Sequence, residues 1–309
     1  MINFRFHLVS LVAVFLALAG GIAIGAAVVD RATIDLLENQ LDRAEIRRVE
    51  TNERNDELQR DVDLWGDFAE QAEDQLVPTR LVGTRLLFIA VQGIDQQPLK
   101  TLQESAVSAG ATVQGTLWLT PKWRLETAGQ TADLASSIGG ASDERPEALR
   151  SRATSRLANV LSSGEGRALL TALQSRAFLD FEPGPAGATL ADVSFGALRY
   201  VLVSGPNADL EPNVVLLPIV QQLAETNAAM LVGQTERPKP NVDGNQPQPD
   251  SIVALVRSDS GLRARVSTVD DLGDYRGRTA AILVLARLGP GRPAHPGLGP
   301  GSDGVLPTP

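Results

Sequence analysis

The side chains with the best spacing for chemistry lie in one short segment, Ser267-Thr268-Val269-Asp270-Asp271. Two adjacent carboxylates can serve as general acid and general base in a hydrolase. The same residues also suit a turn before a helix, because Thr268 and Asp271 have the spacing of a capping box. Capping alone accounts for these residue types. We therefore interpret Thr268, Asp270 and Asp271 as a structural turn and expect no catalysis from them.

Other reactive side chains are scarce. The 309 residues include no Cys, two His and two Met. His7 adjoins a long apolar run and His295 lies in a terminal segment rich in Gly and Pro, so we expect them not to share a site. A Ser-His-Asp or Cys-His arrangement is therefore excluded. Met1 and Met230 leave too few soft ligands for copper. We predict a protein that is not an enzyme and has no catalytic, cofactor-binding or metal-binding residues.

Composition also restricts the class of partner. The net charge of -9 and the lack of a basic stripe argue against nucleic acid as a ligand. Without Cys the chain has no disulfide framework. The partners that remain to be considered are a membrane and other proteins.

An uncharged apolar run covers residues 8–29. A helix of this length can cross the roughly 30 Å hydrocarbon core of a bilayer. A cleaved signal peptide is the alternative, since Ala17-Leu18-Ala19 resembles a cleavage site. The run continues well beyond that site, which favours a retained transmembrane anchor. Arg5 on the short side predicts a cytoplasmic N-terminus (residues 1–7) and an extracytoplasmic remainder, in a single-pass protein of the cell envelope.

Small residues recur every fourth position along this anchor. They are Ala13, Ala17, Gly21 and Gly25. Such a stripe lets two helix backbones approach closely in lipid. Gly and Ala are also common in membrane helices in general, so the stripe by itself could reflect composition alone. We include these four residues in a predicted dimer interface because a second pairing signal follows immediately.

That second signal is a heptad pattern over residues 30–76, which predicts a coiled-coil stalk. Polar Asn55 at a core position could set the register of the pairing. The alternative is a single amphipathic helix folded back on its own domain. We expect a parallel homodimer whose stalk interface includes Ile34, Leu37, Leu41, Asn55, Leu58, Val62 and Trp65.

Residues 77–288 predict a three-layer α/β domain with a mostly parallel sheet, because short apolar runs alternate with helical spacing. The expected strands are 85–92, 111–119, 200–204, 228–233 and 251–257. The expected helices are 97–109, 121–138, 146–161, 166–177, 214–224 and 277–288. Residues 234–250 are rich in Pro, Asn and Gln and predict a flexible loop. Residues 289–309 are dominated by Gly and Pro and predict a disordered tail.

Two motifs resemble one known family. The first is the opening Arg5-x-His7-x-Val9-Ser10-Leu11-x-Ala13-Val14-Phe15-Leu16-Ala17-Leu18-Ala19, and the second is Ser267-Thr268-Val269-Asp270-Asp271 with Gly277-Arg278. With the stalk between them, they resemble the actinobacterial copper transporter family typified by mycobacterial MctB. The resemblance runs over nearly the whole chain as far as Leu288.

The resemblance implies a role in copper efflux or homeostasis as an envelope transport component, with the outer membrane as a further location. A related corynebacterial member, SteB, is linked to a membrane partner, SteA, and to control of cell-wall hydrolysis at division. Copper is thus implied by the family alone, since no copper site is visible in the residues. The alternative function is a non-catalytic, membrane-tethered dimeric scaffold that binds a membrane partner similar to SteA.

Overall fold

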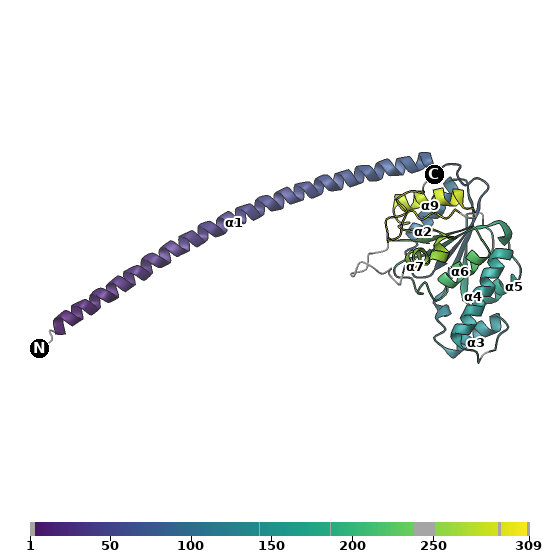
Figure 1. Cartoon of the computed structure of the whole chain (residues 1–309), viewed down its shortest axis with the longest axis horizontal. Helices are drawn as coiled ribbons and strands as arrows, with labels where there is room; N and C mark the ends of the chain where they lie inside the picture. The colour runs from purple at the N-terminus through teal and green to yellow at the C-terminus, as the bar shows by residue number, and fades with distance from the viewer. Residues whose placement is uncertain (1–3, 142, 186, 238–250, 290–291, 308–309) are drawn as a thin grey trace. The chain divides into compact units, whose positions relative to one another are not determined.

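A computed structural model describes residues 4–141, 143–185, 187–237, 251–289 and 292–307 (Figure 1). The chain divides into two compact units, Met1–Asp67 and Phe68–Pro309. The first unit is helical throughout its described length, because the long helix α1 spans Phe4–Leu76 and ends within the second unit. The second unit contains every described strand and all the other helices.

The first unit begins with an apolar stretch, Phe4–Gly25, that is long and apolar enough to cross a membrane. Its small-residue stripe is open in the single chain, since a Cβ added to Gly21 or Gly25 would meet nothing within 4 Å. The predicted stalk, 30–76, belongs to the same helix, and this continuity agrees with the predicted helical pattern. Pairing of two such helices stays a prediction.

The second unit is built on a six-stranded sheet with the order β3-β2-β1-β4-β5-β6. All neighbouring strands are parallel except β3, which runs antiparallel to β2. The α/β class with a mostly parallel sheet is therefore confirmed. The strands are β1 (Arg85–Val91), β2 (Thr112–Leu119), β3 (Leu179–Pro183), β4 (Arg199–Ser204), β5 (Met230–Gln234) and β6 (Ser267–Val269).

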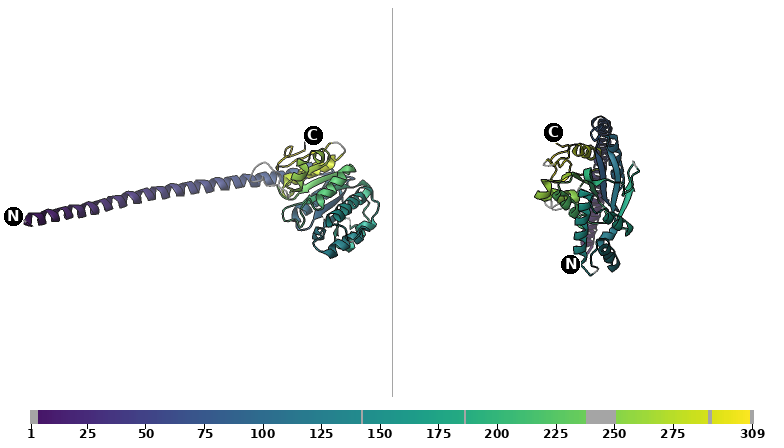
Figure 2. Two further views of the ribbon diagram at one scale, coloured as in Figure 1. Left: turned by 60° about the horizontal axis from the view of Figure 1, so that its bottom comes forward. Right: turned by 90° about the vertical axis from the view of Figure 1, so that its right-hand side faces the viewer.

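Helices cover both faces of this sheet, so the domain has three layers (Figure 2). One face packs against α3 (Ala128–Ser137), α4 (Pro146–Ser163), α5 (Ala168–Ser175), α6 (Leu216–Glu225) and α7 (Ile252–Ser258). The other face packs against α2 (Gln97–Ser108) and α9 (Tyr275–Arg287). A sheet buried on both faces needs continuous apolar strands, and this requirement explains runs such as 85–91.

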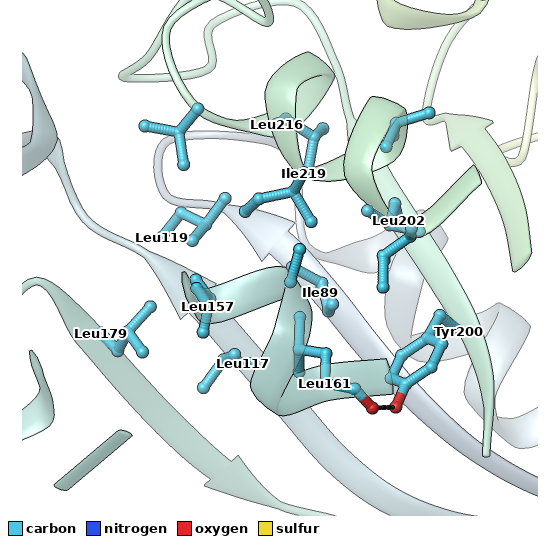
Figure 3. Close-up of a cluster of buried hydrophobic side chains, with 14 of the residues drawn as sticks. Ile89, Leu117, Leu119, Leu157, Leu161, Leu179, Tyr200, Leu202, Leu216 and Ile219 are labelled. Atoms are coloured by element: carbon cyan, nitrogen blue, oxygen red, sulfur yellow. Dashed lines mark hydrogen bonds between the residues drawn. The ribbon is translucent and has the colours of Figure 1, made fainter. Parts of the chain in front are cut away.

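The larger core layer is close-packed around the middle of β1 (Figure 3). Ile89 and Leu202 from the sheet lie in one cluster with Leu157 of α4. Tyr200 is buried there, and its hydroxyl donates a hydrogen bond to the backbone oxygen of Leu161. Burial raises the pKa of the Tyr200 phenol above its ordinary value, so the group stays protonated. This hydrogen bond connects α4 to β4.

A buried carboxylate, that of Glu73, connects the end of α1 to the domain. Ser105 Oγ donates to Glu73 Oε1 at 2.9 Å, and Arg278 Nη2 lies 3.7 Å from Glu73 Oε2. Ser105 belongs to α2 and Arg278 to α9. Glu73 itself is only 8% exposed. The last turns of α1 therefore pack on the same side of the sheet as α2 and α9.

Two sequence predictions about single elements are wrong. Residues 251–257 form helix α7 and not a strand, because Ser251 Oγ accepts the Ala254 N–H and starts a helix. A short apolar run is compatible with either structure, so periodicity could not decide it. The predicted helix 121–138 is split into a 3₁₀ turn, Pro121–Arg124, and α3, because Thr127 and Gln130 form a capping box.

Two short strands were missed, β3 and β6. Each is five residues long or less, which leaves too little alternation to detect. The predicted flexible loop 234–250 begins too early, since Gln234 closes β5 and Thr235 is buried. Residues 238–250 of that loop lie outside the described part of the chain.

Candidate functional site at the carboxyl edge of the sheet

The strand order changes direction between β1 and β4, and in parallel sheets this point is where ligands usually bind. In this chain the point is filled by backbone. Gly93 follows β1 at φ +91°, and a Cβ there would lie 2.6 Å from the Asn207 carbonyl oxygen. The Asp209 N–H also donates to the Gln92 carbonyl at 2.7 Å. The loops after β1 and β4 therefore close on each other and leave no room for a ligand between them.

A cavity of about 290 Å³ lies instead beside the ends of β4 and β5. Glu211, Glu236 and Arg237 contribute charge to its wall. Ser204 Oγ and Thr235 Oγ1, at the ends of these strands, are buried and have no hydrogen-bond partner among the described residues. The size and mixed charge of the cavity suit a small polar molecule and do not indicate a particular reaction.

The most developed polar cluster at this edge is a buried ion pair. Arg257, on α7, places Nη1 2.6 Å from Oδ2 of Asp270, which follows β6. The two side chains are 2% and 0% exposed. Arg257 Nε also donates to Thr268 Oγ1 at 2.8 Å. Charges this deeply buried are stable in a protein only when their remaining hydrogen-bonding positions are also filled.

The remaining positions are filled by backbone from residues 292–307. Asp270 accepts the N–H groups of Leu298 at 2.8 Å and Gly299 at 3.0 Å. Arg257 Nη2 donates to the Pro296 carbonyl at 2.8 Å. The predicted disorder of the tail is therefore wrong for these residues. Composition indicated that the segment could not bury apolar surface, whereas its order comes from hydrogen bonds to buried charges.

The same segment also covers the free side of β6, which is the last strand in the sheet. The Thr268 N–H of β6 donates to the Ala294 carbonyl at 3.0 Å, and Ser267 Oγ accepts the Ala294 N–H at 3.2 Å. An edge strand otherwise presents unpaired backbone groups that other chains can join. Residues 292–307 thus continue the six-stranded sheet beyond β6 as an irregular segment.

His295 is inserted into this cluster and is 3% exposed. Its Nε2 lies 2.9 Å from the Arg263 carbonyl oxygen, which can only accept, so Nε2 carries the proton. Its Nδ1 lies 3.0 Å from Thr268 Oγ1 and accepts the hydroxyl proton. These contacts fit a neutral imidazole with its proton on Nε2. Burial lowers the pKa of His295 below its ordinary value, in agreement with that geometry.

The residues of the predicted turn have roles that differ from a capping box. Thr268 lies within β6 and bonds to Arg257 and His295, so the capping prediction is wrong. The N-cap of α9 is Asp274, whose Oδ1 accepts the Arg276 N–H at 2.9 Å.

Asp270 and Asp271, the other residues of the predicted turn, differ in surroundings. Asp270 binds the ion-pair partner and the terminal segment. Asp271 has a positive φ of 61°, and burial, with the nearby carboxylates of Asp274 and Asp270, raises its pKa.

Sequence reasoning missed two members of the cluster, Arg257 and His295. Arg257 is the one charged residue in the run 251–257, and this was a usable signal of a buried partner. His295 carried no such signal, because its neighbours are Gly and Pro. The predicted interface residues of the anchor and stalk all lie on α1, away from this cluster in the sequence.

Together the fold and the cluster define a class of protein: a single apolar N-terminal helix, a long helix, and an α/β domain with a buried polar site for backbone groups. The chain belongs to the family described as "Copper transport outer membrane protein, MctB", which matches residues 1–307. The Copper transporter MctB of Mycobacterium bovis and that of Mycobacterium tuberculosis are each 26% identical to it over 333 residues, covering 99% of this chain and 99% of theirs.

The hydroxyl of Thr268 can be tested by matched substitutions. Thr268→Val keeps the side-chain shape but leaves Arg257 Nε and His295 Nδ1 without their partner. We expect a loss of about 1–3 kcal/mol in the free energy of unfolding, the usual cost of a buried unsatisfied group. Thr268→Ser keeps the hydroxyl and should lose clearly less. Urea midpoints of the purified full chain measure both. Equal stability of the Val variant and the parent would exclude this network as a source of stability.

Docking of residues 292–307 should weaken in acid. The charged groups that act on His295 are Arg257 and Arg263, which oppose its protonation, and Asp303, which favours it. The docked imidazole has a pKa below its ordinary 6.5, so the released segment binds a proton more readily. Docking is therefore strongest above pH 6.5 and is lost progressively as the pH falls below it.

Amide hydrogen exchange at Leu298 and Gly299, corrected for intrinsic rates, measures this docking between pH 8 and pH 5. Protection should fall across that window in the parent chain. His295→Asn is the matched control, and its protection should depend less steeply on pH. A parent whose protection is constant down to pH 5 would contradict the assignment of a neutral docked imidazole.

Proposed function

We propose that this protein is a membrane-tethered component of copper transport in the cell envelope, with its α/β domain on the extracytoplasmic side. The observation that carries the proposal is the family match, which extends over residues 1–307. The apolar segment Phe4–Gly25 supports a tether at the N-terminal end. Copper is cargo in this proposal. Copper sensitivity of a deletion strain, restored by the parent chain, tests it.

The chemistry of the side chains argues that copper is not held by this chain itself. Cu(I) prefers thiolate or thioether ligands and Cu(II) prefers imidazole. The chain has no Cys. Met230 is buried in β5, and both ring nitrogens of His295 have hydrogen-bond partners. Within the described ranges, no group of three or more His, Cys, Asp or Glu could hold a metal ion. The proposed role is therefore to assemble or position a transport machinery.

A copper titration tests this part of the proposal. The full chain, purified in detergent, is titrated with Cu(I) in the presence of a competing chelator. We expect no metal to be retained, because hard carboxylates bind Cu(I) weakly. His295→Asn serves as the control and should give the same baseline. One chelator-resistant copper ion per chain in the parent would refute the positioning role and favour direct transport.

The second candidate function is a non-catalytic dimeric scaffold that binds a membrane partner similar to SteA and affects cell-wall hydrolysis and division. Exposed apolar side chains at predicted heptad positions favour it. Leu41, Leu58, Val62 and Trp65 are all between 61% and 67% exposed. Burying each against a second helix would contribute up to about 1.5–3 kcal/mol. The two functions are compatible, since a transport machinery also needs an assembled stalk.

Dimer formation is testable with one engineered cysteine, because the chain has none. Leu37→Cys should give efficient cross-linking in membranes if the stalk is a parallel dimer. Adding Leu41→Asp and Leu58→Asp places charges in the seam, the line of heptad core positions where the two helices would meet. The cross-link should then be lost. Ile46→Asp with Leu64→Asp is the matched control, since both residues are exposed but lie outside the seam. Absence of a cross-link in the parent would exclude the dimer.

A further inference from the structure

We propose that the edge of β6 and the Arg257–Asp270 pair form a peptide-binding groove, and that residues 292–307 of a second copy can occupy it in place of the chain's own segment. The ligand class is a Gly- and Pro-rich peptide recognised through its backbone. This proposal goes beyond the proposed function and requires neither copper nor pairing of the stalks.

The groups that read the peptide are held by the domain itself. Arg257 and Asp270 bind each other at 2.6 Å, and Thr268 Oγ1 accepts from Arg257 at 2.8 Å. Arg257 belongs to α7, and Thr268 to β6. The body of the domain therefore supplies both charges, and the terminal segment supplies the backbone groups that fill their remaining hydrogen-bonding positions.

The recognition follows the polarity of a peptide backbone. Arg257 donates to the carbonyls of Pro296 and Pro300, whereas Asp270 accepts the N–H groups of Leu298 and Gly299. The cation thus binds carbonyl oxygens and the anion binds N–H groups along one stretch of backbone. Charge-assisted bonds of this type are stronger than neutral ones. Since the contacts go to backbone, they recognise conformation more than side-chain identity.

Two positions make the groove selective. Gly297 has φ +150°, and a Cβ there would overlap the Asp270 carboxylate, so only glycine fits. His295 fills a closed space between Thr268 Oγ1 and the Arg263 carbonyl. Further along, Arg263 binds the Asp303 carboxylate. The ligand pattern is therefore a histidine followed after one residue by a glycine in a strained conformation, with an acidic residue beyond.

A second copy is the occupant that this pattern fits. Its residues 292–307 are identical, so they make the same contacts, and exchanging an identical element between chains costs no interaction. Residues 288–293 separate α9 from the first paired residue, Ala294, and reach at most about 20 Å. Exchange therefore needs domains that lie close together, a condition that molecules side by side in one membrane can meet.

The test uses a fluorescent peptide with the sequence of residues 292–307 and the full chain in detergent. Gly297→Ala in the chain should release its own segment and open the groove. We expect the labelled peptide to bind this variant and to bind the parent at least about tenfold more weakly, because the parent's groove is filled. His295→Ala is a second way to open the groove. Leu306→Ala, at an exposed position of the segment, should behave like the parent.

A peptide carrying Gly297→Ala is the specificity control and should bind the opened chain at least about tenfold more weakly than the parent peptide. Three results would overturn the proposal. A folded Gly297→Ala or His295→Ala chain could fail to bind the peptide. The parent or the altered peptide could bind equally well, which would place the binding elsewhere. Finally, both variants could fail to fold, which would make the segment an inseparable part of the domain.

Discussion

The carboxyl edge of this domain depends on one buried ion pair, Arg257 with Asp270. Both side chains are almost completely removed from solvent. Removing one partner of such a pair typically costs about 3–5 kcal/mol, because the other charge stays buried and unpaired. Each unfilled hydrogen-bonding position of the two groups adds a further cost of about 1–3 kcal/mol. The surroundings are therefore arranged to fill them: a hydroxyl of β6 on one side, and carbonyls and amides of residues 292–307 on the other.

This requirement explains what the sequence could and could not reveal. The apolar N-terminal helix, the α/β class and most strands follow from apolar patterning, and the run 85–91 forms the buried strand that its pattern predicts. Residues 251–257 have a similar run and form a helix, because Ser251 accepts the Ala254 N–H. Composition does not distinguish a strand from a helix for these residues. Ser251 is a residue type that often starts helices, but the apolar run that follows it fits a strand equally well.

The terminal segment was mispredicted for a related reason. Rules for disorder count the apolar area that a segment can bury, and residues 292–307 have little to offer. They are ordered because a polar site elsewhere in the chain needs their backbone groups. The residues of a Gly- and Pro-rich segment carry no information about a partner that lies in α7 and after β6. The lone charge of Arg257 within an apolar run was the one visible indication of that partner.

The family name and the side-chain chemistry of this chain point to different roles. The family is described by copper transport, yet the chain has no Cys, Met230 is buried in β5, and both ring nitrogens of His295 have hydrogen-bond partners. The built polar site reads peptide backbone through a cation and an anion, which have no preference for a soft metal. Residues 292–307 are held at this site by hydrogen bonds, whereas the apolar core around Ile89 and Leu202 is built from other parts of the chain. The order of the terminal segment therefore depends on buried charge and not on the apolar core.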